Sequence, residues 1–285
     1  MKPFSINIRG RLVEYCRPAV MGIVNVTPDS FYGGSRAGDA ADAGRRAAAM
    51  VAQGADMLDV GAYSSRPGAD DVPEAEECAR LRDALAAVRE AVGPDVPVSV
   101  DTFRASVAAK AVGLWGADIV NDISGGKLDG DMFATVAELR APYILMHMRG
   151  TPATMQTLTD YADVTTDVIR ELTAPLAELE KLGVADVIVD PGFGFAKTLE
   201  QNYSMLRHLD RFALLGRPLL VGVSRKSMIT KLLGISADEA LEGTTAVNTL
   251  ALERGAAIVR VHDVAAAVAA RAVVAATTEE NGFGR

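Results

Sequence analysis

The sequence predicts an α/β protein, a single (β/α)8 TIM barrel with a short N-terminal β-hairpin, and one domain over residues 1–285. Eight short apolar runs rich in β-branched residues alternate with segments of helical pattern. A barrel of this class typically needs roughly 250 residues. No Pro/Ser-rich linker divides the chain. A doubly wound sheet is the alternative, but eight regular units over this length favour closure of the sheet.

The first element, Ile6–Val13, alternates with a period of two around Gly10 and predicts an antiparallel hairpin that could plug the bottom of the barrel. The expected barrel strands are Val20–Val26, Met57–Gly61, Pro97–Asp101, Asp118–Asn121, Tyr143–His147, Val187–Asp190, Pro218–Val223 and Ala257–His262. Helices are expected at about residues 39–53, 73–92, 104–114, 161–182 and 264–276.

The sixth expected strand shows how the units are built. Val187–Val189 is a β-branched run that suits a strand covered on both faces. The strand stops at Asp190, because Pro191 cannot donate to a ladder. The loop Gly192–Lys197 then carries two glycines, two phenylalanines and a lysine. An acid therefore ends a buried strand beside a loop with aromatic rings and a cation, where parallel α/β folds place their chemistry.

Composition narrows the function classes. The chain is 49% hydrophobic and 23% charged, which is ordinary for a soluble globular protein, and its net charge of −8 gives no support for nucleic-acid or acidic-membrane binding. Cys16 and Cys78 are too widely separated to indicate a disulfide framework or a zinc site. The start of the chain lacks the apolar run of a signal peptide, and the apolar stretch Val264–Ala276 is short and contains Arg271. We expect a cytoplasmic protein.

Each of the eight expected strands carries a hydrogen-bonding group at or near its carboxyl end. The set comprises Asn25, Asp59, Asp101, Asn121, His147, Asp190, Ser224 with Lys226, and Arg260 with His262. Any strand end that meets water can be polar, but eight in succession favour one shared concave site. Asp59 can equally be buried support, and His147, between two methionines, suits a packed or loop-orienting role better than catalysis.

The acceptor-rich residues of this set are Asp101, Asn121 and Asp190. They suit a flat heterocycle with an amino-pyrimidine edge, which presents several N–H donors in one plane. A metal cluster is the competing interpretation. It is less favoured because no His or Cys accompanies these acids at ligand spacing.

A second group combines cationic and neutral polar side chains and predicts an anion site. It comprises Asn25, Ser65, Arg66, Arg260 and His262, on the first, second and eighth strands, which become neighbours when a barrel closes. Arg260 and His262 stand at alternate positions and point the same way. Surface salt bridges are the alternative for the two arginines. Ser224–Ser227 could bind a further anion. Its Lys226 could reach over the ring site, and Ser227 could begin a short helix able to receive a carboxylate.

Five motifs in this order resemble the dihydropteroate synthases, the folate-pathway family inhibited by sulfonamides. They are Met21–Phe31, Ser64–Gly68, Asp190–Phe195, Ser224–Ser227 and Arg260–Asp263. The resemblance implies a homodimeric transferase that condenses 7,8-dihydropterin-6-ylmethyl diphosphate with 4-aminobenzoate, with Mg²⁺. It implies that diphosphate leaves ahead of attack by the arylamine.

The resemblance also implies roles for individual residues. Asp101, Asn121, Asp190 and Lys226 would bind the pterin, with Met146 and Gly222 against the ring. Asn25, Ser65, Arg66, Arg260 and His262 would bind diphosphate, with Asn25 as the Mg²⁺ ligand. Ser65, Phe195, Lys226 and Ser227 would form the aminobenzoate side, and Arg66, Lys226, Arg260 and His262 would carry catalysis.

The chain departs from the family pattern at two loops. Ala62-Tyr63 replaces Gly-Glu after the second strand, where Ser65 also replaces Thr, and Ala196 replaces a glycine. Two other functions compete with the synthase. A methyltetrahydrofolate:corrinoid methyltransferase would need the acids but not the cationic group. A non-catalytic pterin-binding paralogue would need no reaction at all.

Overall fold

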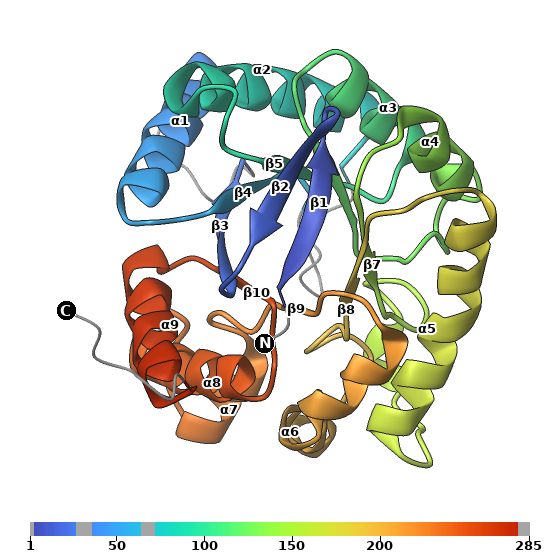
Figure 1. The fold of residues 1–285 in the computed structure, drawn as a ribbon, viewed down its shortest axis with the longest axis vertical. Coiled ribbons are helices and arrows are strands. Elements are labelled where there is room, and N and C mark those ends of the chain that lie inside the picture. Colours follow the sequence, from blue (N-terminus) through green and yellow to red (C-terminus); the bar gives the residue numbers. More distant parts are fainter. Residues whose placement is uncertain (1–2, 27–35, 64–71, 279–285) are drawn as a thin grey trace.

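The protein is a closed barrel of parallel strands surrounded by helices (Figure 1). The computed structural model describes residues 3–26, 36–63 and 72–278, with side chains throughout except at residues 36–39. Strands pair in the order β8-β7-β6-β5-β4-β3-β10-β9, and a parallel bridge between Val189 and Leu219 closes the ring. The barrel strands are β3 (Ala19–Asn25), β4 (Met57–Gly61), β5 (Val98–Asp101), β6 (Ile119–Asp122), β7 (Tyr143–Met146), β8 (Val187–Asp190), β9 (Leu220–Val221) and β10 (Ile258–Val261). The predicted TIM barrel is confirmed.

Helices follow the strands around the outside of the barrel. They are α1 (Arg36–Ala52), α2 (Glu74–Val92), α3 (Ala105–Gly113), α4 (Met132–Leu139), α5 (Val164–Lys181), α6 (Leu199–Arg207), α7 (Ser227–Leu233), α8 (Leu241–Glu253) and α9 (Val264–Thr278), with short 3-10 helices η2 (Met155–Thr157) and η3 (Leu209–Leu215). The predicted helix at 161–182 begins later, because the Asp163 carboxylate accepts the Thr166 N–H as an N-cap. Strand β9 is shorter than predicted, since Pro218 has no N–H to donate. No helix of the described residues is long and apolar enough to cross a membrane.

The N-terminal hairpin closes one end of the barrel. Strands β1 (Phe4–Ile8) and β2 (Arg11–Tyr15) pair in antiparallel register around Arg9 and Gly10, which both have positive φ, at 52° and 81°. Such a two-residue turn matches the twist of the flanking strands. Buried Ile6 and Ile8 pack against apolar side chains from inside the barrel, among them Met21. The predicted plug is confirmed, and Figure 1 shows the hairpin lying across the barrel.

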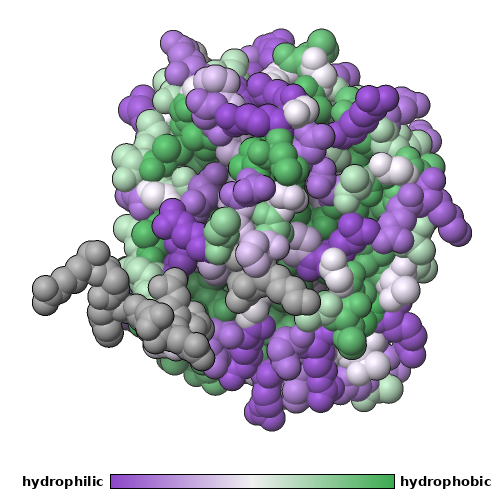
Figure 2. Space-filling model, in the orientation of Figure 1, coloured by the Kyte–Doolittle hydropathy of each residue, from purple (hydrophilic) through white to green (hydrophobic). Residues whose placement is uncertain are grey.

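The two-residue period of the strands sorts side chains between helices and barrel interior. Outward residues such as Val60, Val100 and Val259 are buried in the core between barrel and helices. Inward residues near the hairpin form an apolar layer that includes Ile119, Ile188 and Leu220. Two positions further along the same strands, the inward residues become polar or small. Figure 2 shows the opposite face, which carries the hairpin, and its surface mixes hydrophilic and hydrophobic side chains.

Candidate active site

A buried ionic cluster links four strands at the carboxyl end of the barrel. The Arg260 guanidinium on β10 donates from Nε to Asp59 Oδ2 (2.6 Å) and from Nη2 to Asp101 Oδ2 (2.8 Å). Asn121 on β6 donates its amide N–H to the same Asp59 oxygen (3.0 Å). Asp59 is fully buried. Asp59 therefore acts as buried support for the site, which is one of the two roles that the sequence suggested for it. Its hydrogen bond also fixes the orientation of the Asn121 amide.

The carboxyl group of Asp101 has an unusual environment. Burial raises its pKa to about 7, and the nearby negative charge of Asp59 adds to the shift while the positive charge of Arg260 opposes it. Asp190, at the end of β8, also has a raised pKa because it is buried, although the ammonium of Lys226 opposes this. One Asp190 oxygen accepts the Gly192 N–H at 2.8 Å. The two acids are thus held by different partners within one desolvated region.

Gly222 lies between Asp190 and Arg260. A Cβ atom at Gly222 would stand 3.9 Å from Asp190 Oδ2 and 3.9 Å from Arg260 Cβ, with no closer contact. The absence of a side chain there leaves space on the inner face between an acid and a cation. Met146 is buried, and its position on β7 is in register with Asp190 on β8. The predicted ring-binding residues of the described strands therefore converge on one space.

The loop after β8 reaches across to the start of α7. Lys226 Nζ donates to the backbone oxygen of Phe193 (2.6 Å) and lies 4.6 Å from the centroid of the Phe195 ring. Burial lowers the pKa of Lys226 to about 8, helped by the positive charge of Arg260 and opposed by Asp190. Helix α7 begins at Ser227, as predicted. Phe195, Lys226 and Ser227 thus belong to one wall of the site.

His262 follows β10 and is held by Ser224. The Ser224 hydroxyl accepts the His262 backbone N–H (3.2 Å) and lies 3.1 Å from the ring Nδ1. Burial lowers the pKa of His262 to about 4, and the charges of Arg260 and Arg225 lower it further. The imidazole is therefore neutral at neutral pH and acts as a hydrogen-bonding group rather than a cation.

Two arginines near this region differ from the predicted pattern. Arg225 was grouped with a possible anion site, but its guanidinium forms two hydrogen bonds to the Asp263 carboxylate, at 3.0 and 2.7 Å, and so ties the loop after β9 to the start of α9. Arg46 on α1 was not predicted. It donates to the backbone oxygen of Asn25 at 3.2 Å and contributes positive potential at His262. Arg46 lies in a helix rich in alanine and arginine, and nothing in that sequence pattern indicates that it approaches the site.

Asn25 ends β3 and is half-buried. Its side-chain amide makes no hydrogen bond to the rest of the described chain, so its oxygen can act as a ligand. The described residues contain no group of three or more His, Cys, Asp or Glu side chains that could hold a metal ion. Ser65 and Arg66, and the motif residues from Thr27 to Phe31, lie outside the described residues. Tyr63, one of the departures from the family pattern, packs its ring edge against Phe103 (centroids 5.0 Å apart).

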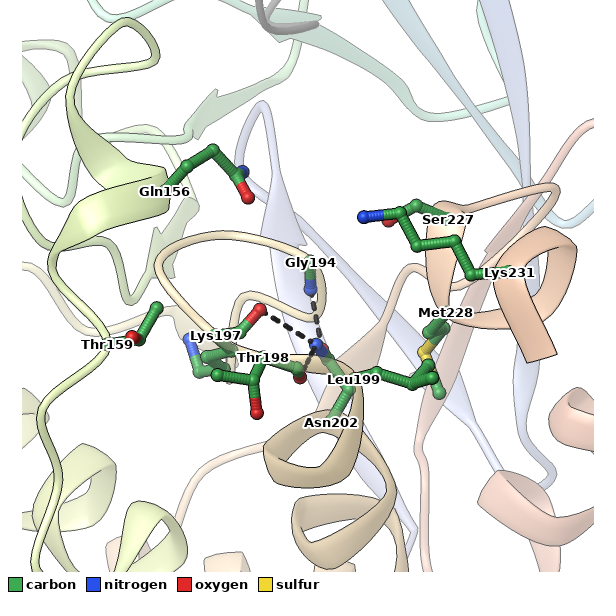
Figure 3. A pocket seen from close by; sticks show the side chains of 10 residues that line it. All are labelled: Gln156, Thr159, Gly194, Lys197, Thr198, Leu199, Asn202, Ser227, Met228 and Lys231. Carbon is green, nitrogen blue, oxygen red and sulfur yellow. Dashed lines mark hydrogen bonds between the residues drawn. The ribbon is translucent and has the colours of Figure 1, made fainter.

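A small cavity of about 120 Å³ lies beside the Phe195 loop (Figure 3). Residues from three parts of the chain line it: Gln156, Thr159, Gly194, Lys197, Thr198, Leu199, Asn202, Ser227, Met228 and Lys231. It shares Ser227 with the wall described above. The cavity therefore adjoins that wall at the start of α7.

Comparison with known proteins agrees with this geometry. The family described as pterin binding enzyme matches residues 21–262, which is most of the chain and includes every strand of the barrel except the first two residues of β3. The chain belongs to the pterin-binding enzymes.

Within that family, its relatives are dihydropteroate synthases. The Synechocystis dihydropteroate synthase is 46% identical over 253 residues, which cover 88% of this chain and 86% of that protein. A probable bifunctional folylpolyglutamate synthase/dihydropteroate synthase of Haloferax volcanii is 46% identical over 267 residues, and there the match spans 93% of this chain but only 31% of the longer protein.

Solved structures show the same likeness. A Yersinia pestis dihydropteroate synthase in a sulfonamide drug complex superposes with a TM-score of 0.89 and 38% identity, over 96% of this chain and 99% of that one. A Xanthomonas albilineans dihydropteroate synthase with 4-aminobenzoic acid gives a TM-score of 0.86 and 38% identity, over 94% and 96%.

Proposed function

We propose that the protein condenses 7,8-dihydropterin-6-ylmethyl diphosphate with 4-aminobenzoate, giving 7,8-dihydropteroate and diphosphate in folate biosynthesis. The observation that carries the proposal is the space at Gly222, bounded by the acid Asp190 and the cation Arg260. A substrate with a flat N–H-rich ring and a charged leaving group needs both kinds of partner within a few ångströms. The relatives named above supply the substrate class.

The pterin ring would be held by acceptors from three strands. Asn121 donates one amide N–H to Asp59, so its amide oxygen, which makes no hydrogen bond within the described residues, points away and could accept from the ring. Asp101 and Asp190 each have one oxygen engaged by the protein and a second that makes no hydrogen bond within the described residues. Met146 and Gly222 provide the surface on which the ring lies. A water-excluded site makes each of these hydrogen bonds stronger than it would be in solvent.

The diphosphate would lie beside Asn25, Arg260 and His262, together with Ser65 and Arg66. Asn25 suits Mg²⁺, which commonly takes one protein oxygen and completes its shell with phosphate oxygens and water. Mg²⁺ bound there would neutralise part of the negative charge that develops on the departing diphosphate. Neutral His262 would donate one hydrogen bond. Within the described residues, Arg260 Nη1 makes no hydrogen bond and could take a phosphate oxygen, since the other guanidinium nitrogens engage Asp59 and Asp101.

Catalysis would consist of positioning and electrostatic stabilisation. As the C–O bond to diphosphate breaks, negative charge grows on the departing oxygen and Arg260, with Arg66, stabilises it. The carbocation left on the methylene is delocalised into the dihydropterin ring held by Asp101 and Asp190. The arylamine, placed against Phe195, Lys226 and Ser227, then attacks the methylene carbon with its nitrogen lone pair. The C–N bond forms, and the nitrogen loses one proton to the departing diphosphate or to water. By analogy with oxyanion donors, one such cation lowers the barrier by roughly 3–4 kcal/mol.

The deciding experiment is diphosphate release from the purified protein. Sustained release over many turnovers should require the pterin diphosphate, 4-aminobenzoate and Mg²⁺ together, because the arylamine must trap the carbocation to complete each turnover. A corrinoid methyltransferase would release no diphosphate, and a non-catalytic paralogue would bind the pterin without turnover. Either result would refute the proposal. We also propose that the protein is a cytoplasmic homodimer. Analytical ultracentrifugation of the purified protein tests whether it is a dimer.

A further inference from the structure

Lys197 is a buried lysine to which the proposed reaction assigns no role. It is only 5% exposed, although it lies in a loop. Its Nζ lies 2.9 Å from Gly192 O, 2.9 Å from Phe195 O and 3.1 Å from His147 Nδ1. Burial lowers the pKa of Lys197 to about 7, opposed by the negative charge of Asp190. In its protonated form the ammonium has three N–H donors, and here each one finds an acceptor. The side chain therefore fills the inside of its own loop and replaces the water that would otherwise solvate two backbone carbonyls.

The hydrogen-bond chain continues outward from Lys197. His147 Nε2 lies 3.0 Å from Glu171 Oε2 on α5, and Arg149 also pairs with Glu171. Because Nδ1 faces the ammonium donor, we assign the ring proton to Nε2, from which it is donated to Glu171. Burial lowers the pKa of His147 to about 4, so the ring is neutral as this assignment requires. The network anchors the loop to β7 and α5.

The same loop is held from its other side by Asn202 on α6. Asn202 Oδ1 accepts the Gly194 N–H at 2.7 Å, and its Nδ2 donates to Thr198 O at 2.6 Å and to Lys197 O at 3.3 Å (Figure 3). Three loop residues have positive φ: Gly192 at 70°, Gly194 at 82° and Ala196 at 51°. The alanine adopts this left-handed conformation at a cost of roughly 1 kcal/mol. Fixed partners are needed to keep such a loop in one shape.

This loop carries the aromatic ring of the arylamine side. Phe195 contacts Lys226 through its ring, and Phe193 contacts the same ammonium through its backbone oxygen. Lys197 thus holds the carbonyl of Phe195, while the Phe195 side chain faces the site. The position of the ring relative to Lys226 depends on a loop shape that Lys197 maintains.

We infer that Lys197 is a positioning residue for the arylamine: it holds the loop after β8 so that Phe195 and Lys226 form one wall for the incoming aromatic amine. This inference rests on the proposed function. The pterin ring shares Lys226 with the arylamine, and its partner Asp190 accepts the Gly192 N–H of this loop. Its other partners, Asp101 and Asn121, lie on strands away from the loop, so loss of Lys197 should affect the arylamine more than the pterin.

The test is the substitution Lys197→Met, which keeps the length and volume of the stem but removes the three donors. We expect the KM for 4-aminobenzoate to rise about tenfold or more, the size of one lost charged hydrogen bond, while the KM for the pterin diphosphate changes less than about threefold. Lys181→Met, which removes an exposed lysine at the end of α5, is the matched control and should match wild type. Hydrogen exchange should be faster in peptides covering residues 192–196 of Lys197→Met only.

Equal increases in both KM values would indicate general structural damage and overturn the inference, as would an unchanged KM for the arylamine. If Lys197→Met does not fold, Asn202→Ala decides, because it releases the loop at Gly194 without removing a buried charge. It must show the same unequal effect, or the inference is wrong. Absence of diphosphate release by the wild-type protein would refute the proposed function instead, so the two failures are distinguishable.

Discussion

Arg260 and Asp59 form a buried pair at the mouth of the barrel, with Nε 2.6 Å from Oδ2. The pairing fixes the guanidinium plane before any ligand arrives. Because Asp59 also orients Asn121, a single carboxylate sets the direction of one cationic and one amide group of the site. These groups are therefore already oriented in the folded protein and need not reorganise when the substrate binds, which is the basis of electrostatic preorganisation.

Asp59→Asn should lower stability, since among the described residues it leaves the buried guanidinium with Asp101 as its single carboxylate ion-pair partner. We expect a loss of about 2 kcal/mol in the free energy of unfolding, measured by denaturant titration. The control is Asp95→Asn, which breaks the exposed pair with Arg11 and should cost less than about 1 kcal/mol. Equal costs for the two substitutions would contradict the support role of Asp59.

Arg260→Ala should depress turnover by a few hundredfold, the effect of losing about 3–4 kcal/mol of stabilisation of the leaving group. The barrel should remain folded but lose stability, as with Asp59→Asn, because the buried Asp59 carboxylate and the Asp101 carboxyl group lose their cationic partner. Steady-state release of diphosphate measures the first effect and circular dichroism the second. Turnover equal to wild type in a folded variant would remove Arg260 from the mechanism.

Gly222→Ala should block the ring space while leaving the fold intact. The added methyl has no protein atom closer than 3.9 Å, so unfolding free energy should change by less than about 1 kcal/mol. A ring in that space would meet the methyl, and affinity for a pterin should fall at least about tenfold. Calorimetric titration measures this. Gly113→Ala, at a position where a Cβ meets no atom within 4 Å, is the control and should bind normally.

Pterin affinity should depend on pH through Asp101. Its pKa is raised to about 7, so the carboxylate that accepts ring N–H groups is lost as pH falls through 7, and affinity should fall by up to about tenfold per unit below it. Stability changes in the opposite direction. The folded carboxyl binds its proton more tightly than the unfolded one, so the contribution of Asp101 to stability decreases as pH rises from about 4 to 7.

Asp101→Asn provides the comparison for this pH dependence. Protonation of the ligand itself affects both proteins equally, so the ratio of wild-type to variant affinity isolates the Asp101 contribution. Titrations between pH 5.5 and 8.5 should show this ratio rising with pH. A constant ratio would mean that another group governs pterin binding.

Arg140→Gly should stabilise the protein. Arg140 is exposed and takes the left-handed conformation at the end of α4, with φ at 50°. Glycine adopts this conformation without the steric penalty of a Cβ, and we expect a gain of up to about 1 kcal/mol in the free energy of unfolding. Arg207→Gly, inside the last turn of α6, should instead destabilise by about 1 kcal/mol. A loss of stability in Arg140→Gly would contradict the prediction.

Much of the fold was predictable because its signals are local. Apolar runs marked all eight barrel strands, and the Arg9-Gly10 turn marked the hairpin. Helices α4 and α8 were missed, since their apolar positions do not stand out from neighbouring segments. In the site, the strand ends pointed to residues such as Asp101 and Asp190, which the structure places as a half-buried and a buried acid at the carboxyl ends of β5 and β8; their roles stay predictions. The partners of Asp59 and Lys197 were not predictable, because they lie across the barrel or along a folded loop, and no spacing in sequence encodes which acceptor a buried cation meets.

The alternation of side chains along β10 limits how this strand can change. Arg260 faces the interior, while Val259 and Val261 are buried against the helices. Adding or deleting one residue within the strand would turn the guanidinium toward the apolar layer and the valines into the site. Substitutions can accumulate along β10, but gaps in its alignment with functional relatives should be confined to the connections on either side.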